Sequence, residues 1–471
     1  MAANGKSTVG VCLLGCGVVG GGVERILRQQ RELLYRRTGI DFELRHVVVK
    51  DRNDYPPNHA ELPMSTDANA AIDDPRSDIV VELIGGTGVA GSFIERALKL
   101  GKPVVTANKS LLAARGPELF ALAREHGTCI AFEASCGGGI PIIQSLLHGL
   151  IANRCQALLG IVNGTCNFIL TQMTQKGHSY AQALADAQQA GFAEANPTLD
   201  VSGRDSAQKL AILAGLAFNV RIAESDIHIE GIDTLQPADI AYAADLGYVI
   251  KLLAIAECVD GWQSPVEASG TAQPAAAPAA QPRRSDAPPL LCLRVHPTLV
   301  HREDQLAQVS GSFNAISFFG HALGHALFYG RGAGRTPTAS AIVSDLVGVA
   351  LGTTPQMFKR LHVFPDQTPA ARVLPIEQLT SRYYLRLSAK DQPGVLAQVT
   401  AALGRHGISL SAVMQRESEN GDGYVPVVIT THRAREGDIR QALKEIDALA
   451  TIQPPTVCLR IMDQPREFAA G

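Results

Sequence analysis

A charged stretch in the middle of the chain has residue types that can bind a small polar molecule and move a proton. Gly191–Lys209 reads GFAEANPTLDVSGRDSAQK and contains Glu194, Asp200, Asp205 and Lys209. Asp205 and Lys209 are one helical turn apart, so on a helix they share a face. Glu194 and Asp200 precede that helix, around an Asn-Pro turn. A lysine among carboxylates suits amino-acid binding and proton transfer; a solvated loop with a surface ion pair, worth roughly 0–1 kcal/mol, is the alternative.

A second lysine follows a predicted strand of a parallel sheet. Pro103–Thr106 is a short apolar run that leads through Ala-Asn to Lys109. Open α/β sheets bind ligands at the carboxyl ends of their strands, so Lys109 is expected to point toward the site. Ile79–Ile84 is a continuous apolar run, typical of a strand buried on both faces. It stops at Gly85, where a cofactor can pass close to the backbone.

The glycine-rich loop GCGVVG lies between a predicted strand, Thr8–Leu14, and a helical pattern that runs through Arg31. Glycines here permit a tight turn and close approach to a pyrophosphate, and the helix N-terminus favours its charge. In this context the GxGxxG motif predicts a dinucleotide site, whereas a glycine-rich turn without ligand is the alternative. The residues of this predicted site are Gly15, Gly17, Val18, Val19 and Gly20.

The end of the second predicted strand, Phe42–Val49, bears on the choice of cofactor. It continues as Lys50-Asp51-Arg52. Lys50 and Arg52 favour the 2′-phosphate of NADPH, whereas Asp51 suits the ribose hydroxyls of NADH. Both cofactors stay open at this point.

Two further loops have small residues at positions where a ligand can approach. Glu133–Pro141 reads EASCGGGIP, and such a loop exposes carbonyls and amides that can hold a cation or a substrate edge. Gly334 lies in a second glycine-rich turn that opens a helix and can close over the nicotinamide. Cys136 also permits another hypothesis, an acylating semialdehyde dehydrogenase with a cysteine nucleophile, although no histidine base stands out nearby.

The end of the chain predicts a separate small domain with no catalytic constellation. Its pattern gives the ferredoxin-like order βαββαβ, which suggests a binding or regulatory module or a dimerisation appendage. The predicted strands are Tyr383–Leu387, Ile408–Gln415, Tyr424–Thr430 and Val457–Met462, and the predicted helices are Val395–His406 and Glu436–Ala448.

The middle of the chain gives weaker signals. We expect a strand in Gly160–Leu170, an amphipathic helix over Ala238–Val259, and strands at Leu291–Val300 and Leu306–Val309. His321 and His325 have a spacing that can hold a metal on a helix, but they lack a third ligand and are expected to be packing or surface residues.

Length and composition limit the classes of protein. The chain has 471 residues, enough for two or three domains of roughly 100–200 residues each. Its formal net charge is -3 with no basic patch, so nucleic acid is not an expected partner. Nine cysteines without a CxxC pair favour a reducing cytoplasm over a disulfide framework or a zinc site. The absence of a signal peptide and of a spanning apolar run predicts a cytoplasmic protein with no membrane partner.

Taken in order, these motifs resemble those of homoserine dehydrogenases over nearly the whole chain. The tail, with DQPGVLAQV after Tyr383, is similar to an ACT domain, a small amino-acid-sensing fold. The segments that carry the resemblance are Gly15–Gly20, Thr106–Lys109 (TANK), Glu133–Pro141, Val162–Leu170 (VNGTCNFIL), Gly191–Lys209 and Gly330–Leu346 (GRGAGRTPTASAIVSDL).

The resemblance implies an α/β fold class with three parts: a Rossmann-like dinucleotide-binding domain, an α+β catalytic and dimerisation domain, and a C-terminal ferredoxin-like ACT domain. The implied boundaries are 1–135 completed by 325–360, then 136–324 with a disordered insertion at 264–289, a linker at 361–381, and 382–463. The Ala/Pro-rich insertion is not a feature of the family.

The resemblance also implies an activity, the reversible reduction of L-aspartate 4-semialdehyde to L-homoserine with NADP or NAD, on the route to threonine, methionine and isoleucine. By position, Lys209 resembles the catalytic proton donor, and Lys109 the lysine that touches both cofactor and substrate. Glu194 resembles the ligand of the homoserine amine, with Asp200 and Asp205 as neighbours. Asn196 stands where the family often has Asp.

Further partners follow from the same resemblance. A sodium ion would be held by main-chain oxygens, which map to Glu133, Cys136, Gly138 and Ile140. L-threonine is the expected effector at the ACT domain, and the assembly is expected to be a homodimer or homotetramer. A third hypothesis is a sensor with a degenerate enzyme body. The presence of Lys109, Glu194 and Lys209 argues against it.

Overall fold

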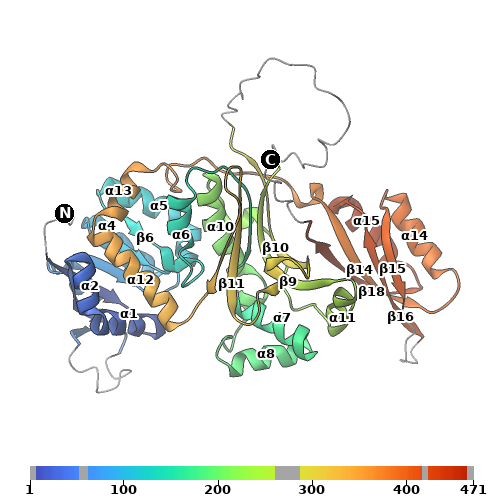
Figure 1. Ribbon diagram of the computed structural model, residues 1–471, viewed down its shortest axis with the longest axis horizontal. Helices are drawn as coiled ribbons and strands as arrows, with labels where there is room; N and C mark the ends of the chain where they lie inside the picture. The colour runs from blue at the N-terminus through green and yellow to red at the C-terminus, as the bar shows by residue number, and fades with distance from the viewer. Residues whose placement is uncertain (1–6, 52–61, 260–286, 416–422, 464–471) are drawn as a thin grey trace, which may run out of the picture.

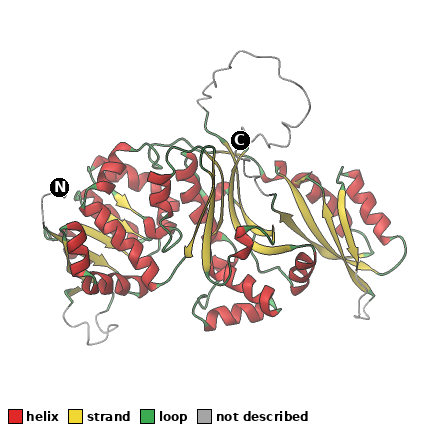
Figure 2. Cartoon of the chain, in the orientation of Figure 1, coloured by secondary structure: helices red, strands yellow, loops and turns green. Residues whose placement is uncertain are grey.

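The structure, a computed structural model, describes residues 7–51, 62–259, 287–415 and 423–463. Three parts follow one another along the long axis of the molecule (Figure 1). A sheet with helices around it lies at one end, a mixed sheet lies in the middle, and a smaller α/β unit lies at the other end (Figure 2). The predicted α/β class is therefore confirmed.

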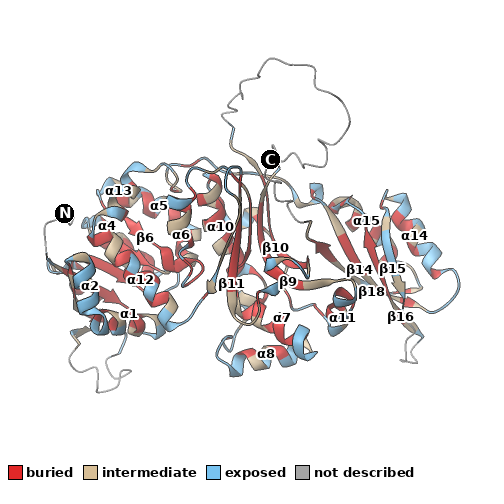
Figure 3. Cartoon of the chain, in the orientation of Figure 1, coloured by how far each residue is buried: buried red, intermediate tan, exposed pale blue. Residues whose placement is uncertain are grey.

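The N-terminal sheet has six parallel strands in the order β3-β2-β1-β4-β5-β6. This order reverses direction between β1 and β4, which is where doubly wound sheets bind their ligands. The strands are β1 (Thr8–Leu14), β2 (Asp41–Val48), β3 (Met64–Ser65), β4 (Ile79–Glu82), β5 (Val104–Thr106) and β6 (Ile130–Ala131). The three runs predicted as strands occupy β1, β4 and β5, which are buried except at Thr8, and buried red strands fill this end of the molecule in Figure 3.

Helices cover both faces of this sheet. Two of them come from late in the sequence and return to it, and α12 packs against α1 (Figure 1). The helices are α1 (Val18–Gln29), α2 (Arg31–Thr38), α3 (Ala68–Asp73), α4 (Val89–Lys99), α5 (Lys109–Glu125), α12 (Arg335–Ala350) and α13 (Thr353–Arg360). Gly22 permits the α1–α12 contact, because a Cβ there would lie 2.8 Å from the Arg335 carbonyl oxygen.

The middle of the molecule is a mostly antiparallel sheet flanked by helices. Its strands are β7 (Cys155–Ile161), β9 (Tyr248–Cys258), β10 (Leu290–His301), β11 (Phe313–Gly320) and β12 (Gly324–Arg331), with β8 (His228–Ile229) and β13 (Arg372–Val373) beside β10. Its helices are α6 (Ile142–Gln144), α7 (Gly164–Lys176), α8 (Tyr180–Gln189), α9 (Thr198–Val201), α10 (Arg204–Phe218) and α11 (Pro237–Asp245). The short helical turns η4 (Ser145–Gly149), η5 (Glu224–Asp226) and η7 (Gln305–Gln308) complete it, whereas η3 (Glu133–Ser135) packs against α12 and η8 (Ile376–Gln378) against a helix of the C-terminal unit.

The C-terminal unit has the predicted βαββαβ order, with a short added strand. Its elements are β14 (Thr380–Lys390), α14 (Val395–Arg405), β15 (Leu410–Gln415), β16 (Tyr424–Thr431), β17 (Ala434–Arg435), α15 (Glu436–Asp447) and β18 (Ile452–Ile461). Its sheet is continuous with the middle sheet, because β18 pairs in parallel with β10 through Thr298–Arg460 and Leu299–Ile461. The two sheets therefore form one twelve-stranded sheet across the two parts.

Three expectations for the middle of the chain need correction. The helix expected over Ala238–Val259 ends at Asp245, and the rest is strand β9, whose apolar run pairs with β10 along eleven residues. The strand expected at Leu306–Val309 is the helical turn η7, which the Asp304 side chain caps. In Gly160–Leu170 the strand ends at Ile161 and α7 begins at Gly164.

Two other expectations concern the insertion and membranes. The insertion at 264–289 falls almost wholly outside the described residues. In the part of the chain that the structure describes, no helix has the length and apolar character needed to cross a membrane.

Candidate active site

Two lysines from different parts of the fold meet at one buried carboxylate. Lys209 Nζ lies 2.7 Å from Asp205 Oδ2, one turn away on α10 as the spacing predicts. Lys109 Nζ lies 3.1 Å from Asp205 Oδ1. Lys109 is the first residue of α5, directly after the carboxyl end of β5. The structure therefore joins the two predicted lysines at Asp205.

Local backbone features set where α5 and α10 begin. The Asn108 side chain caps α5 by accepting a hydrogen bond from the Leu111 amide at 3.1 Å. Gly203 precedes α10 with φ +85°, and a Cβ there would lie 3.2 Å from the Glu230 carbonyl oxygen. A residue with a side chain is strained in this conformation, so glycine fixes the start of the helix that carries Asp205.

Asn163 links this carboxylate to a second one. Its Nδ2 donates hydrogen bonds to Asp200 Oδ1 at 2.7 Å and to Asp205 Oδ2 at 2.8 Å. Its Oδ1 accepts from the Cys166 amide, which caps α7. The preceding carbonyl, of Val162, accepts a hydrogen bond from Lys209 Nζ at 2.7 Å. Sequence reasoning missed Asn163 as a site residue, although an Asn-Gly pair before a helix was visible.

The charges of the centre stabilise one another. Burial alone would raise the pKa of Asp205, but the two lysines outweigh it and lower the pKa to about 2. For Lys109, burial lowers the pKa, and the Asp205 charge outweighs that effect, so the net pKa is raised. Burial raises the pKa of Asp200, and the nearby Asp205 charge adds to the shift while the Asn163 hydrogen bond opposes it. At neutral pH Lys109 is a cation and Asp205 is an anion.

Glu194 is not brought into this cluster. Its side chain is exposed, and its carboxylate makes no hydrogen bond or ion pair with any residue that the structure describes. Asn196 acts locally, because its Oδ1 accepts hydrogen bonds from the amide and hydroxyl of Thr198 at the start of α9. The loop between α8 and α9 therefore lies open beside the buried centre.

The loop from Glu133 to Pro141 lies against the same centre. Cys136 is fully buried with its Sγ 3.9 Å from the Lys209 carbonyl oxygen, and burial raises the pKa of its thiol to about 12. A buried, protonated thiol is a poor nucleophile, so the acylating hypothesis loses its main support. Gly138 has φ +56°, and a Cβ there would lie 2.4 Å from the Gly332 carbonyl oxygen.

Side chains around this loop serve structure. The Glu133 carboxylate accepts hydrogen bonds from the amides of Ile143 and Gln144 at 2.9 and 2.8 Å. The Ile140 side chain is buried in the core. Among the described residues, no group of three His, Cys, Asp or Glu side chains could hold a metal ion. His321 and His325 match their expected roles: His321 accepts a hydrogen bond from the Arg154 amide, and His325 stacks on Phe319.

The predicted dinucleotide residues gather at one edge of the N-terminal sheet. Gly15 has φ +93°, and a Cβ there would lie 2.8 Å from the Leu83 carbonyl oxygen, so the loops after β1 and β4 touch. A Cβ at Gly20 would lie 2.1 Å from the Gly15 carbonyl oxygen, which explains the last glycine of the motif. Gly17 and Val18 are exposed where the phosphates of a dinucleotide would lie, and Val19 is half-buried.

The other predicted cofactor residues surround this edge. Gly85 is exposed after β4 with φ +80°, Gly334 is exposed before α12 with φ +121°, and Lys50 is exposed after β2. Arg52 lies outside the described residues. Sequence reasoning missed Glu82, whose buried carboxylate accepts hydrogen bonds from the Gly85 amide and the Thr106 hydroxyl, both at 2.8 Å. Glu82 thus ties the Gly85 loop to the strand that leads to Lys109.

Comparisons with known proteins agree with this arrangement. The family model for homoserine dehydrogenase matches residues 141–347, that for the homoserine dehydrogenase NAD-binding domain matches 15–133, and that for the ACT domain matches 383–450. A homoserine dehydrogenase from Pseudomonas aeruginosa is 42% identical over 96% of this chain and 98% of its own length. One from Synechocystis is 39% identical over 97% of this chain and 100% of its own.

A solved structure is also similar along its whole length. The crystal structure of a homoserine dehydrogenase from Thiobacillus denitrificans superposes with a TM-score of 0.85 at 39% identity, covering 97% of this chain and 98% of that one. A nucleotide-binding edge, a buried lysine–carboxylate centre and a C-terminal ACT domain are thus present in one chain, and the chain belongs to the homoserine dehydrogenase family.

Proposed function

We propose that this NAD(P)-dependent oxidoreductase interconverts L-aspartate 4-semialdehyde and L-homoserine with Lys209 as the proton donor. One observation carries the assignment: Lys109 and Lys209, from two parts of the fold, meet at Asp205 beside the cofactor edge. The bound cofactor supplies the hydride to the carbonyl carbon. The chain must therefore supply a proton and charge stabilisation for the developing alkoxide.

The hydrogen bonds of Lys209 indicate how that proton is held. An ammonium group has three donors, of which Asp205 and the Val162 carbonyl oxygen take two. The third is left for the substrate oxygen. Lys109, whose pKa is raised by Asp205, stays charged and serves to orient the substrate and to stabilise negative charge. Asp205 holds both ammonium groups in place.

The amino group of the substrate requires a carboxylate near this centre. Asp200 is half-buried and held by Asn163, so we assign it to the substrate ammonium, with which charge-assisted hydrogen bonds are strong. The family resemblance assigns the same amine to Glu194. Glu194 lies on the exposed loop between α8 and α9, and this loop would have to close over the substrate for Glu194 to approach Asp200.

We further propose NADP as the preferred cofactor, supported by exposed Lys50 at the end of β2. Lys50→Ala should lower kcat/KM for NADP⁺ by about tenfold and leave that for NAD⁺ unchanged, because a 2′-phosphate contact is lost. Equal effects on both cofactors would remove Lys50 from the specificity site.

A sodium ion at the main-chain oxygens of Glu133, Cys136, Gly138 and Ile140 is part of the proposal. Carbonyl oxygens suit a hard cation. The loop also lies beside two buried carboxyls, Glu133 and Asp345, whose pKa values burial raises and which a cation would stabilise as anions. The melting temperature in NaCl should be higher than that in choline chloride at equal ionic strength. Equal melting temperatures would rule out a stabilising sodium site.

We propose L-threonine as the effector of the ACT domain. A cavity of about 400 Å³ opens beside the turn between β14 and α14, and its lining includes Lys390, Asp391, Gln392 and Gln415 together with apolar side chains. Polar groups around an apolar pocket suit a small amino acid. Asp391→Ala should abolish threonine inhibition at unchanged kcat, whereas Lys444→Ala, exposed on α15, should leave it intact. Inhibition that persists in Asp391→Ala would place the effector elsewhere.

The assembly is proposed to be a homodimer or homotetramer. The twelve-stranded sheet ends at β12 and β15, strands that can pair with another copy. On β12 Tyr329 is more than half exposed, and Leu323 is half exposed just before it. Analytical ultracentrifugation tests this, and a monomer at assay concentration would refute it.

The decisive assay follows cofactor absorbance with L-homoserine and NADP⁺ or NAD⁺, with and without L-threonine. Turnover that threonine suppresses supports the reaction and the effector together. Turnover that is insensitive to threonine keeps the enzyme and rejects threonine as effector. Absence of turnover with both cofactors would favour a sensor with an inactive body.

A further inference from the structure

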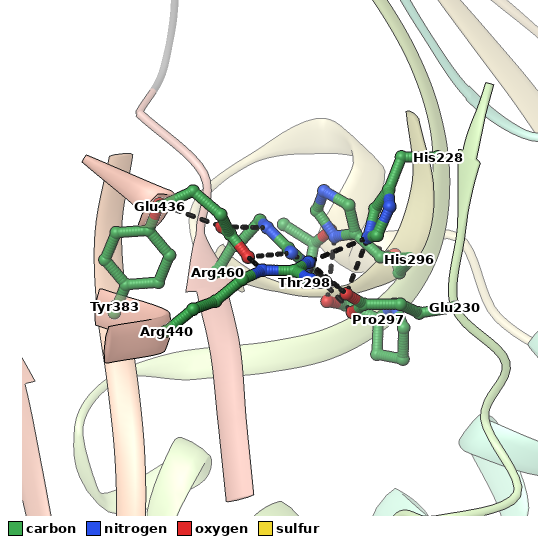
Figure 4. A network of polar contacts seen from close by, with 9 residues as sticks. All are labelled: His228, Glu230, His296, Pro297, Thr298, Tyr383, Glu436, Arg440 and Arg460. Carbon is green, nitrogen blue, oxygen red and sulfur yellow. Dashed lines mark hydrogen bonds and ion pairs between the residues drawn. The ribbon is translucent and has the colours of Figure 1, made fainter. Parts of the chain in front are cut away.

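A cluster of charged side chains, buried on the ACT side, joins the ACT domain to the catalytic part of the chain (Figure 4). Arg460, near the end of β18, holds the Glu230 carboxylate with both terminal nitrogens, at 2.8 and 2.9 Å. The same guanidinium donates to the Glu436 carboxylate at 2.9 and 2.6 Å, and the Tyr383 hydroxyl donates to Glu436 at 3.0 Å. Arg460 and Glu436 are almost fully buried, whereas the Glu230 side chain is 34% exposed, so the contact between the two parts lies at the edge of the buried cluster.

The catalytic side of this cluster is also held firmly. Glu230 follows β8, and its amide donates to the Val295 carbonyl oxygen of β10 at 2.8 Å. His228 Nε2 lies 2.7 Å from Glu230 Oε1 (Figure 4). Burial alone would raise the pKa of Glu230, but its hydrogen bonds with His228 and Arg460 outweigh burial and keep the pKa well below the usual range. Glu230 is therefore an anion at neutral pH and pairs with the Arg460 guanidinium.

The backbone next to Glu230 packs against the turn that carries Asp200. A Cβ at Gly231 would lie 2.5 Å from the Val201 carbonyl oxygen, so the two backbones touch. The Ile232 amide donates to that same oxygen at 2.9 Å. On the other side of the turn, Gly203 lies against the Glu230 carbonyl group. The segment from Glu230 to Ile232 thus forms a wall behind the turn from Asp200 to Gly203.

We propose that Arg460 of the ACT domain is a positioning residue for substrate binding: through Glu230 it fixes the Asp200–Gly203 turn and so places the Asp200 carboxylate. This inference rests on the proposed substrate role of Asp200. Asn163 holds that side chain, and the wall holds its backbone. The ion pairs between Asp205 and the two lysines do not depend on Arg460, so affinity for homoserine should change more than turnover.

The test uses the full-length chain with Glu230→Gln and Arg460→Lys. Glutamine keeps the shape of Glu230 and removes its charge, and lysine keeps the charge of Arg460 but cannot form the two-pronged contact. Each should raise KM for L-homoserine roughly tenfold, because small displacements of a positioning group are costly, with kcat and KM for NADP⁺ changed less than about twofold. A folded Glu230→Gln or Arg460→Lys with normal KM for homoserine would overturn the proposal.

A matched control is a second buried ion pair between the same two parts. Arg386 of β14 binds Asp239 of α11 at 2.6 Å, and Tyr384 also contacts Asp239. Arg386→Lys should lower the melting temperature as Arg460→Lys does, yet leave KM for homoserine unchanged. An equal rise in KM in both lysine variants would mean that any loosening of the ACT domain has this effect, which contradicts a specific role of Arg460.

Asp200→Asn separates this inference from the proposed function. It should raise KM for homoserine at least as much as Glu230→Gln does. A normal KM in Asp200→Asn would refute the substrate role of Asp200 itself. A raised KM in Asp200→Asn together with a normal KM in Glu230→Gln would refute only the connection through Arg460.

Discussion

At the scale of single residues, Asp205 is a buried anion shared by two cations. A buried charge is tolerated when it is paired and hydrogen-bonded, and here Lys109, Lys209 and Asn163 meet that condition. If either lysine moved away from Asp205, its own charge and part of the Asp205 charge would be left unpaired. The centre is thus held in one geometry before substrate arrives.

Removal of the Lys209 amine tests its role directly. Lys209→Ala should lower kcat by about 10²-fold or more, because general acids contribute 10²–10⁴-fold, while the dissociation constant for NADP⁺ stays the same. Lys109 and Asn163 still hold Asp205, so the site keeps its shape. Steady-state rates and fluorescence titration of the cofactor measure both quantities. Lys176→Ala, at an exposed position at the end of α7, is the control. A near-normal kcat in Lys209→Ala would exclude Lys209 from the mechanism.

The buried thiol of Cys136 gives the opposite expectation. Cys136→Ala should keep most of the activity, because the thiol is protonated and serves packing. Turnover and melting temperature of the purified variant measure the two effects separately. Complete loss of turnover in a variant that melts normally would revive the acylating hypothesis.

Sequence reasoning reached these residues to different depths. Helical spacing predicted that Asp205 and Lys209 share a face, and the position of Lys109 followed from the rule that ligands bind where parallel strands end, but their roles came from the family resemblance. Asn163 was missed because its contacts depend on how the end of β7 meets the start of α10, more than thirty residues later. Glu194 was expected near these residues but is exposed outside their cluster, because no sequence pattern fixes the side-chain position of a loop residue.

At the scale of elements, β9 shows why a short apolar run is ambiguous. Tyr248–Cys258 was expected to be helical, but its eleven residues pair with β10 and seven of them are buried. Apolar residues on both faces remove the alternation that marks a strand. The partner strand decides the outcome, and it comes after an insertion that separates the two in sequence.

Lys251, in the middle of β9, should leave a mark on stability. Burial lowers its pKa from 10.5 to about 8, and its Nζ donates to the Val309 carbonyl oxygen at 2.6 Å. Between these two values the unfolded chain binds a proton that the folded chain does not, so this residue makes stability rise with pH. Below that window the folded chain must bury a charge.

Lys251→Met should remove this contribution. The melting temperature of the original chain minus that of the variant should increase from pH 8 to pH 10.5, the window of the shift. Lys359→Met, at an exposed position of α13, should show no such trend. A difference that stays constant across the window would mean that Lys251 titrates normally.

At the scale of the whole molecule, one sheet runs from β12 in the catalytic part to β15 in the ACT domain. Local patterns predicted the dinucleotide-binding part and the βαββαβ part, whereas the α+β middle was expected only from the family resemblance. It did not predict their connection. The β10–β18 contact involves two residue pairs, and Arg460 meets Glu230 across 230 positions of the chain.

A truncation after Leu379 should therefore damage the enzyme as well as remove the proposed effector site. It removes β18 from β10 and leaves Glu230 and Asp239 without their arginines. We expect a lower melting temperature and more aggregation by light scattering. Asp391→Ala, at the effector cavity, should melt as the original chain does. A truncated chain with unchanged melting and unchanged KM for homoserine would show that the two parts are independent.

The shared sheet also limits how this chain can be recombined with its relatives. An ACT domain taken from another protein would bring its own last strand and its own residue at position 460, but the matching carboxylate at position 230 belongs to the recipient. A chimera would need the residues at positions 230 and 460 exchanged together. Exchange of the ACT domain is thus tied to the exchange of a few residues in the catalytic part.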